Sequence, residues 1–275
     1  MTAKISPASV SDLSATMLIP LWAKAVEHDR PDALLRDAEA RRMMGLIDFD
    51  FSVFASAKGS QVGCCARAAM LDDYTRACLA QHPHAVVVHL GAGLDARYER
   101  LGRPPVTAWY ELDLPPAMAL RQKLLPASGN VYLAASMLDE AWMDTAAAHG
   151  QPVLLVAEGV FMYFDAATMQ DWFARLARKL PQAHVIFDAL PAKLVGKQKR
   201  HDSLKKMGQN PPAFKWGIRS MDELAGFGLH VLAHQGLSSR CGKRYPWPLR
   251  LLYRTAWGRR HLDMQMIWAR LAAPR

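Results

Sequence analysis

The strongest signal for the fold in this sequence is the stretch His84-Ala85-Val86-Val87-Val88-His89-Leu90-Gly91-Ala92-Gly93-Leu94-Asp95. It begins with a largely apolar run, residues 84–90, which is typical of a strand buried on both faces of a parallel sheet. Gly91 and Gly93 follow at once, where a tight turn leads from a strand into a helix. Because the amides of such a turn point at a ligand, the stretch predicts an α/β domain with a nucleotide-type binding loop.

Further strand candidates follow this one at intervals that leave room for crossover helices. They lie at residues 106–112, 131–135, 152–157 and 184–188, with two last candidates at 228–234 and 264–271. Asp165 is the expected N-cap of a helix that ends at Leu180. The alternation of strands and helices predicts a doubly wound α/β fold with a mainly parallel sheet.

The residues before the first strand are expected to be helical. Segments 31–54 and 61–81 carry apolar residues at helical spacing. We therefore divide the chain into N-terminal helices that form a lid or cap, 1–83, and an α/β domain, 84–275. Within that domain, residues 190–212 are rich in lysine and contain glycine and a proline pair, which predicts a mobile surface insertion.

The bulk composition is that of an ordinary globular protein. Hydrophobic residues make up 51% and charged residues 21% of the 275 residues, which is enough to form a core without disulfides or metal. The four cysteines lack Cys-x-x-Cys spacing, and no carboxylate accompanies His82, His84 and His89, so no metal site is expected. Neither a signal-peptide pattern nor a membrane-spanning apolar run is found, and we place the protein in the cytoplasm.

The net charge of +9 is unevenly distributed. From Pro191 onward there are seventeen Lys or Arg against four Asp or Glu, a net charge of +13, which leaves −4 for the rest. Such a basic third could attract nucleic acid, an anionic membrane or an acidic small molecule. A solvated face without a partner is the favoured interpretation, and nucleic acid ranks below a small molecule.

A carboxylate about twenty residues after the glycine loop completes the pattern of a nucleoside site. Asp113 ends the second strand candidate, where it could accept hydrogen bonds from both hydroxyls of a ribose. A nicotinamide-dinucleotide oxidoreductase also fits, because Gly91, Gly93 and Ala96 satisfy the relaxed form of its fingerprint. Asp95 argues against a pyrophosphate, since like charges would meet at one helix end. S-adenosylmethionine has no phosphate, and Asp95 could bind its ammonium group.

Three separated runs together resemble the leucine carboxyl methyltransferase superfamily: residues 86–101, 109–115 and Ala157-Glu158-Gly159-Val160-Phe161-Met162-Tyr163. Residues 136–142, 187–188 and 215–218 also resemble its tetracenomycin-type polyketide O-methyltransferases, so that the likeness covers most of the chain from Ile19 onward. The resemblance implies a class I, Rossmann-like methyltransferase with a seven-stranded sheet under an N-terminal helical lid.

The resemblance also implies the cofactor contacts, position by position. Arg67 matches an arginine that grips the cofactor's carboxylate through paired donors. Glu158 matches a glutamate that faces the methionine end, and Tyr163 follows it closely. We take these last two as positioning candidates, with no catalytic residue assigned. The residues expected to bind the cofactor are Arg67, Gly91, Gly93, Asp95, Asp113, Ser136, Met137 and Glu158.

Two positions depart from the family's pattern. Many relatives have Asp-Leu after the third strand to bind the adenine, whereas this chain has Ser136-Met137. A backbone amide or the serine hydroxyl would then serve the edge of the adenine, with Met137 on its face. Lys24 stands where an arginine is expected in the N-terminal helix.

The resemblance implies transfer of a methyl group from S-adenosylmethionine, with S-adenosylhomocysteine as product, to an oxygen of a small, polyketide-like metabolite. The N-terminal helices and residues 190–215 are expected to line the acceptor site. A carboxylate acceptor is already ionised near neutral pH and needs no general base, whereas a phenol would benefit from one. An NAD-type oxidoreductase that uses the same Gly-x-Gly loop is the alternative function.

Overall fold

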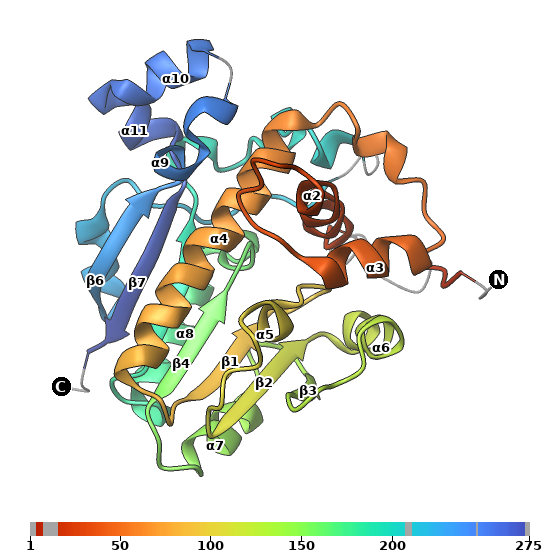
Figure 1. The fold of residues 1–275 in the computed structure, drawn as a ribbon. Coiled ribbons are helices and arrows are strands. Elements are labelled where there is room, and N and C mark those ends of the chain that lie inside the picture. The colour runs from red at the N-terminus through yellow and green to blue at the C-terminus, as the bar shows by residue number, and fades with distance from the viewer. Residues whose placement is uncertain (1–3, 8–15, 207–210, 246, 273–275) are drawn as a thin grey trace.

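The computed structural model describes residues 4–7, 16–206, 211–245 and 247–272. Its described strands form one seven-stranded sheet in the order β3-β2-β1-β4-β5-β7-β6 (Figure 1). Strands β1 to β5 pair in parallel, while β7 runs antiparallel between β5 and β6. The doubly wound, mainly parallel sheet is therefore confirmed. The strands are β1 (Val86–Leu90), β2 (Ala108–Asp113), β3 (Val131–Ala134), β4 (Val153–Ala157), β5 (His184–Ala189), β6 (Leu229–Gly236) and β7 (Gln265–Leu271).

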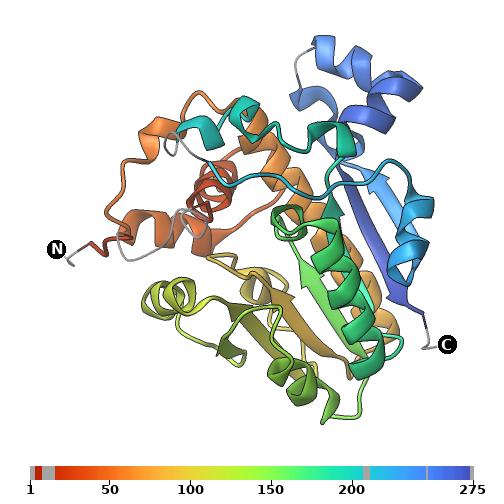
Figure 2. The same ribbon diagram turned by 180° about the vertical axis from the view of Figure 1, so that it is seen from behind.

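Helices cover both faces of this sheet. Helix α4 (Lys58–Gln81) crosses one face (Figure 1), and α8 (Ala166–Lys179) lies on the other (Figure 2). Successive side chains of a strand point to opposite faces, so Val87 packs in the core beside α4 while Val86 and Val88 pack beside α8. Burial on both sides explains why the first strand is a continuous apolar run.

The N-terminal segment is less helical than expected. Helix α2 (Leu18–His28) is followed by an irregular stretch, and only α3 (Ala38–Leu46) and a 3₁₀ turn (Phe51–Phe54) form within 31–54. The late start of α3 has a local cause, because the Asp37 side chain accepts a hydrogen bond from the Ala40 amide and caps the helix there. Helix α4 begins three residues earlier than the 61–81 expectation.

The remaining helices connect the strands. Asp165 caps α8 by accepting a hydrogen bond from the Thr168 amide, as predicted. The connections contain α5 (Arg97–Arg100), α6 (Pro115–Leu124), α7 (Ala141–Ala147), α9 (Ser238–Cys241), α10 (Trp247–Arg254) and α11 (Ala256–Leu262). Among the described residues, no helix is both long and apolar enough to cross a membrane.

The segment after β5 differs from a purely surface insertion. It folds into short 3₁₀ turns at Ala192–Leu194, Gln198–Arg200 and Leu204–Lys206. Leu190, Leu204 and Phe214 are buried in the core that also contains α2 and α3, so this segment is packed against the N-terminal helices. Its residues 207–210 lie outside the described part of the chain. The apolar residues spaced among its lysines provide this packing.

Candidate functional site

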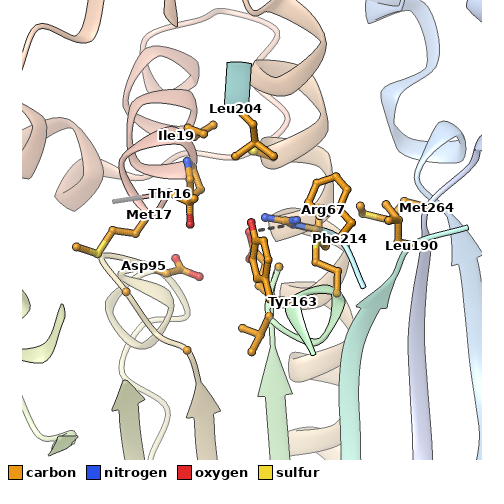
Figure 3. Close-up of a pocket in the computed structure, with 18 of the residues that line it drawn as sticks. Thr16, Met17, Ile19, Arg67, Asp95, Tyr163, Leu190, Leu204, Phe214 and Met264 are labelled. Atoms are coloured by element: carbon orange, nitrogen blue, oxygen red, sulfur yellow. Dashed lines mark hydrogen bonds and ion pairs between the residues drawn. The ribbon is translucent and has the colours of Figure 1, made fainter. Parts of the chain in front are cut away.

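A cavity of about 830 Å³ opens at the carboxyl ends of β1, β2 and β4 (Figure 3). Ligands of open α/β sheets bind at this edge, because the loops that follow the strands converge there. Every residue that the sequence proposed for the site lines this one cavity: Arg67, Gly91, Gly93, Asp95, Asp113, Ser136, Met137, Glu158 and Tyr163. The structure thus brings together residues spread over about a hundred positions of the chain.

The glycine loop and Asp113 form one hydrogen-bonded unit. Gly91 and Gly93 have φ angles of 61° and 48°, a conformation that favours glycine. A Cβ on Gly91 would lie 2.5 Å from a methyl group of Val160. The Gly93 amide donates to Asp113 Oδ2 and the Leu114 amide to Oδ1, each at 2.7 Å. Burial raises the pKa of Asp113, while these two amides oppose the shift.

Asp95 lies among three cations at the start of the helix that follows the loop. Its Oδ1 is 2.9 Å from Lys24 Nζ and 2.7 Å from an Arg100 nitrogen. Its Oδ2 is 3.4 Å from Arg97 and is buried without a hydrogen-bond partner among the described residues. Burial alone would raise the pKa of Asp95, but Arg100, Lys24 and Arg97 hold it well below its ordinary value. A buried, ionised acceptor oxygen of this kind fits the ammonium group of S-adenosylmethionine.

Arg67 and Glu158 are held close together by ion pairs. Arg67 Nε is 3.3 Å from Glu158 Oε1, and its Nη1 is 3.3 Å from Asp188 Oδ2. Glu158 is also paired with Arg97 at 2.5 Å and with Lys24 at 3.6 Å. Burial disfavours the charge on Glu158, yet Lys24, Arg67 and Arg97 lower its pKa. Both side chains are therefore charged and held in place by these ion pairs.

Gly159 provides the space that Arg67 occupies. It has a φ angle of 69°, and a Cβ there would lie 3.0 and 3.1 Å from the two terminal nitrogens of Arg67. Its amide donates to Asp188 Oδ1 at 2.5 Å, while the other oxygen of Asp188 faces the same arginine. Gly159 and Asp188 belong to the runs that resemble the family, 157–163 and 187–188, but neither was expected to contribute to the site. Their signal was a glycine directly after Glu158 and a carboxylate near the end of β5.

Ser136 and Met137 reach the cavity from the loop after β3. The carbonyl of Met137 accepts hydrogen bonds from the indole nitrogens of Trp142 and Trp172, at 3.2 and 2.8 Å. Ser136 Oγ accepts a bond from the Leu138 amide, so this loop is fixed from within. Although Ser136-Met137 departs from the family's Asp-Leu pattern, the loop after β3 still lines the cavity and is held by these hydrogen bonds.

Beyond the glycine loop, the cavity continues into an apolar chamber. Tyr163 stands between the two parts, with its ring 6.0 Å from that of Phe214 (Figure 3). Leu190, Leu204 and Met264 line the far side. Burial raises the pKa of Tyr163, so its hydroxyl stays protonated at neutral pH.

The chamber also contains polar residues that sequence reasoning missed. Lys193, Lys197 and His201 line it, all from the segment that was expected to border the acceptor. His201 Nδ1 lies 3.1 Å from Ser203 Oγ, and burial lowers the pKa of the imidazole. No spacing rule distinguishes these residues from other surface lysines and histidines, and only their tertiary position does.

Several known proteins are similar to this chain in sequence. The family model described as leucine carboxyl methyltransferase matches residues 17–177. The tetracenomycin polyketide synthesis O-methyltransferase TcmP of Streptomyces glaucescens is 35% identical over 204 residues, 74% of each chain. A putative S-adenosyl-L-methionine-dependent methyltransferase of Mycolicibacterium gilvum is 28% identical and covers 86% of this chain and 89% of its own.

A solved methyltransferase structure has a similar fold. The S-adenosylmethionine-dependent methyltransferase from Anabaena variabilis superposes with a TM-score of 0.53 at 11% identity, covering 82% of this chain and 96% of its own. The family match includes all nine proposed site residues, and the nicotinamide alternative finds no support in it. The chain belongs to the leucine carboxyl methyltransferase family and is an S-adenosylmethionine-dependent methyltransferase.

Proposed function

We propose that this enzyme methylates an oxygen atom of a small, largely apolar acceptor bound in the chamber beyond Tyr163. The observation that supports this most directly is a single cavity in which the glycine loop and Asp113 lie at one end, while mainly apolar side chains, with Lys193, Lys197 and His201 among them, line the other end. The likeness to TcmP, a polyketide synthesis O-methyltransferase by its printed name, supports an aromatic, polyketide-like acceptor.

In this proposal each polar residue of the first half of the cavity contacts one part of the cofactor. Asp113 accepts the ribose hydroxyls, and the Gly91 to Gly93 backbone lies along the methionine portion. Asp95 and Glu158 face the ammonium end, and Arg67 faces the carboxylate. Ser136 and Met137 hold the adenine. S-adenosylmethionine itself supplies an activated methyl group, so the protein needs chiefly to align the acceptor and to exclude water.

We also propose that the N-terminal part, 1–83, serves as a lid on the α/β domain, 84–275. The start of this part supports the role, because Thr16 and Met17, just before helix α2, line the cavity (Figure 3), as does Lys24 of α2. Lys24 occupies the arginine position of the family's pattern and pairs with Asp95 and Glu158. The described residues of the segment 190–215 are proposed to border the acceptor end, since Leu190, Leu204 and Phe214 line the cavity there.

Two acceptor oxygens are compatible with the chamber. A carboxylate is supported by Lys193 and Lys197, which add positive charge to the lining. A phenol is supported by His201, since a lowered pKa keeps the imidazole neutral and able to accept a proton at pH 7. Tyr163 is proposed to position the acceptor beside the methyl group in either case.

Calorimetric titration with S-adenosylhomocysteine tests the cofactor contacts. We expect Arg67→Ala to weaken binding by roughly 1.5–3 kcal/mol, the range for hydrogen bonds to charged groups. Arg76→Ala is the control, because Arg76 lies on the same helix, pairs with Asp73 at the exposed surface and does not line the cavity. An affinity that is equal for the wild type and Arg67→Ala would remove Arg67 from the site. Methyl transfer from labelled cofactor to aromatic acids and phenols then tests the acceptor.

A further inference from the structure

Helices α10 and α11 form a helical hairpin, residues 247–262, that projects beyond the β6 and β7 end of the sheet (Figures 1 and 2). Among the described residues, no side chain of α10 is buried. The hairpin holds four of the large hydrophobic side chains that are exposed in the described chain: Trp247, Leu249, Leu251 and Trp257. Exposed apolar side chains gathered in one place indicate a contact surface.

The outward face of α10 combines apolar and cationic side chains. Trp247, Arg250, Leu251 and Arg254 follow one another at positions i, i+3, i+4 and i+7, so they share one face of the helix. Trp247 is 70% exposed and Leu251 is 50% exposed. Within the described structure, no carboxylate pairs with Arg250 or Arg254. These four residues are called the outward stripe.

The charge around the stripe has one sign. Residues 238–262 contain seven Lys or Arg and no Asp or Glu. Arg240 and Arg244 are paired with acids of α4 and of the α2 region, but Arg250 and Arg254 lie further out on the hairpin. A short amphipathic helix with tryptophan and leucine between arginines is the pattern of a helix that lies in the interface of an anionic bilayer.

We infer that the outward stripe docks this enzyme on an anionic lipid surface. Tryptophan prefers the headgroup region of a bilayer, Leu251 adds apolar area, and the two arginines bind lipid phosphates. A second copy of the chain is disfavoured as the occupant, because two hairpins of the same positive charge repel each other. Nucleic acid is disfavoured because the stripe offers only one aromatic ring, Trp247, whereas single-stranded nucleic acid is bound by successive rings on which successive bases stack.

The position of the hairpin connects this surface to the proposed acceptor chamber. Tyr253 and Leu262 belong to the hairpin and line the cavity from it. Trp257 lies under Lys193, whose ammonium is 4.5 Å from the ring centroid. A bilayer bound at the outward stripe would therefore lie next to one wall of the chamber. This arrangement suits an apolar acceptor that partitions into lipid.

The test is co-sedimentation of the full-length protein with vesicles of phosphatidylcholine alone or mixed with phosphatidylglycerol. We expect binding to the mixed vesicles only, with release at high salt. Arg250→Gln combined with Arg254→Gln should weaken it about 30-fold, from about fivefold for each charge near the surface. Trp247→Ala with Leu251→Ser should also weaken it. Val131→Ser, at an exposed apolar position on β3, is the control and should bind like the wild type.

Three results would overturn the inference. The first is equal binding to both kinds of vesicle, or no binding to either. The second is a concentration-dependent shift in elution volume that the Trp247 and Leu251 substitutions abolish, which would assign the stripe to a second copy. The third is retention on single-stranded RNA that depends on the same residues, without vesicle binding. Titration of each variant with S-adenosylhomocysteine separates these outcomes from failure of the cofactor site, because the outward stripe does not line the cavity.

Discussion

Lys24 Nζ lies 2.9 Å from Asp95 Oδ1, and both side chains are almost fully buried. The pair joins α2 of the N-terminal segment to the start of the helix that follows the glycine loop. Lys24 also lies 3.6 Å from Glu158, after β4. One cation thus connects the proposed lid to two separate loops of the α/β domain, and its loss affects both stability and the cavity.

Replacement of Lys24 by methionine is expected to lower the free energy of unfolding by about 3 kcal/mol, the lower end of the cost of breaking a buried ion pair. Arg97 and Arg100 remain beside Asp95 and limit the loss. Urea unfolding monitored by circular dichroism measures this change in the free energy of unfolding. Lys179→Met is the control, because that lysine pairs with acids at the surface and should change stability by less than about 1 kcal/mol. Equal effects of the two substitutions would contradict the importance of the buried pair.

Gly159→Ala is expected to disrupt the cofactor site through Arg67. The added Cβ would lie 3.0 and 3.1 Å from the terminal nitrogens of Arg67, so the guanidinium would have to shift by a few tenths of an ångström within its ion pairs with Glu158 and Asp188. Gly150→Ala is a matched control, because Gly150 has a similar φ angle of 62° and open space around its Cβ position. Both variants should lose roughly 1–2 kcal/mol of stability from backbone strain. Only Gly159→Ala should weaken binding of S-adenosylhomocysteine in calorimetry, and similar affinities for both variants would refute the role of Arg67.

Substitution of Asp113 by alanine should weaken the binding of S-adenosylmethionine and S-adenosylhomocysteine to the same extent. Both molecules carry the ribose, and the loss of charge-assisted hydrogen bonds costs roughly 1.5–3 kcal/mol. Asp165→Ala removes a carboxylate from the cap of α8 and serves as the control. Titration of each variant with both molecules makes the comparison. A loss that affects one molecule alone would show that Asp113 does not contact the shared ribose.

The stability of the wild type should fall more steeply in acid than that of Asp95→Asn. In the folded state the pKa of Asp95 lies well below its ordinary value of 3.8, so the unfolded chain binds the proton more readily. The stabilisation of the folded state by ionised Asp95 is fully present above about pH 4. It is lost as the pH falls through the pKa of Asp95 in the folded state. Asp113 and Asp188 act in the opposite direction, because burial raises their pKa. They are common to both proteins, so the difference between the two urea-unfolding curves reports the loss of Asp95 together with the change that this loss causes in the pKa of Glu158 and Asp72, which Asp95 raises.

The pH dependence of turnover should identify the acceptor oxygen. For a phenol with His201 as base, the rate should fall as the pH drops through the lowered pKa of the imidazole, and His201→Gln should remove this limb. For a carboxylate acceptor, the rate should be level from about pH 6 to pH 9 in both proteins. A phenol profile that is the same with and without His201 would exclude the imidazole as the base.

The parallel sheet and the glycine loop were predictable because they rest on local rules. A strand buried on both faces must be apolar throughout, and the turn after β1 requires glycine, so both leave a continuous signal in residues 84–95. The positions of Asp113 and Glu158 follow from the same rule, since Asp113 is the last residue of β2 and Glu158 comes directly after β4. Asp165 was equally predictable, because a helix cap is a local interaction.

The charges around these residues depended on tertiary structure. Asp95 is held ionised by Lys24, which is 71 positions away, and by two nearby arginines, and no local pattern encodes such a long-range pair. The approach of Arg67 to Gly159 likewise requires α4 to cross the sheet above β4. Local sequence patterns alone therefore predict which part of the backbone forms the cofactor loop. Only the packing of α2, α4 and the segment after β5 decided which charges and which apolar wall face it, because those contacts join residues distant in the chain.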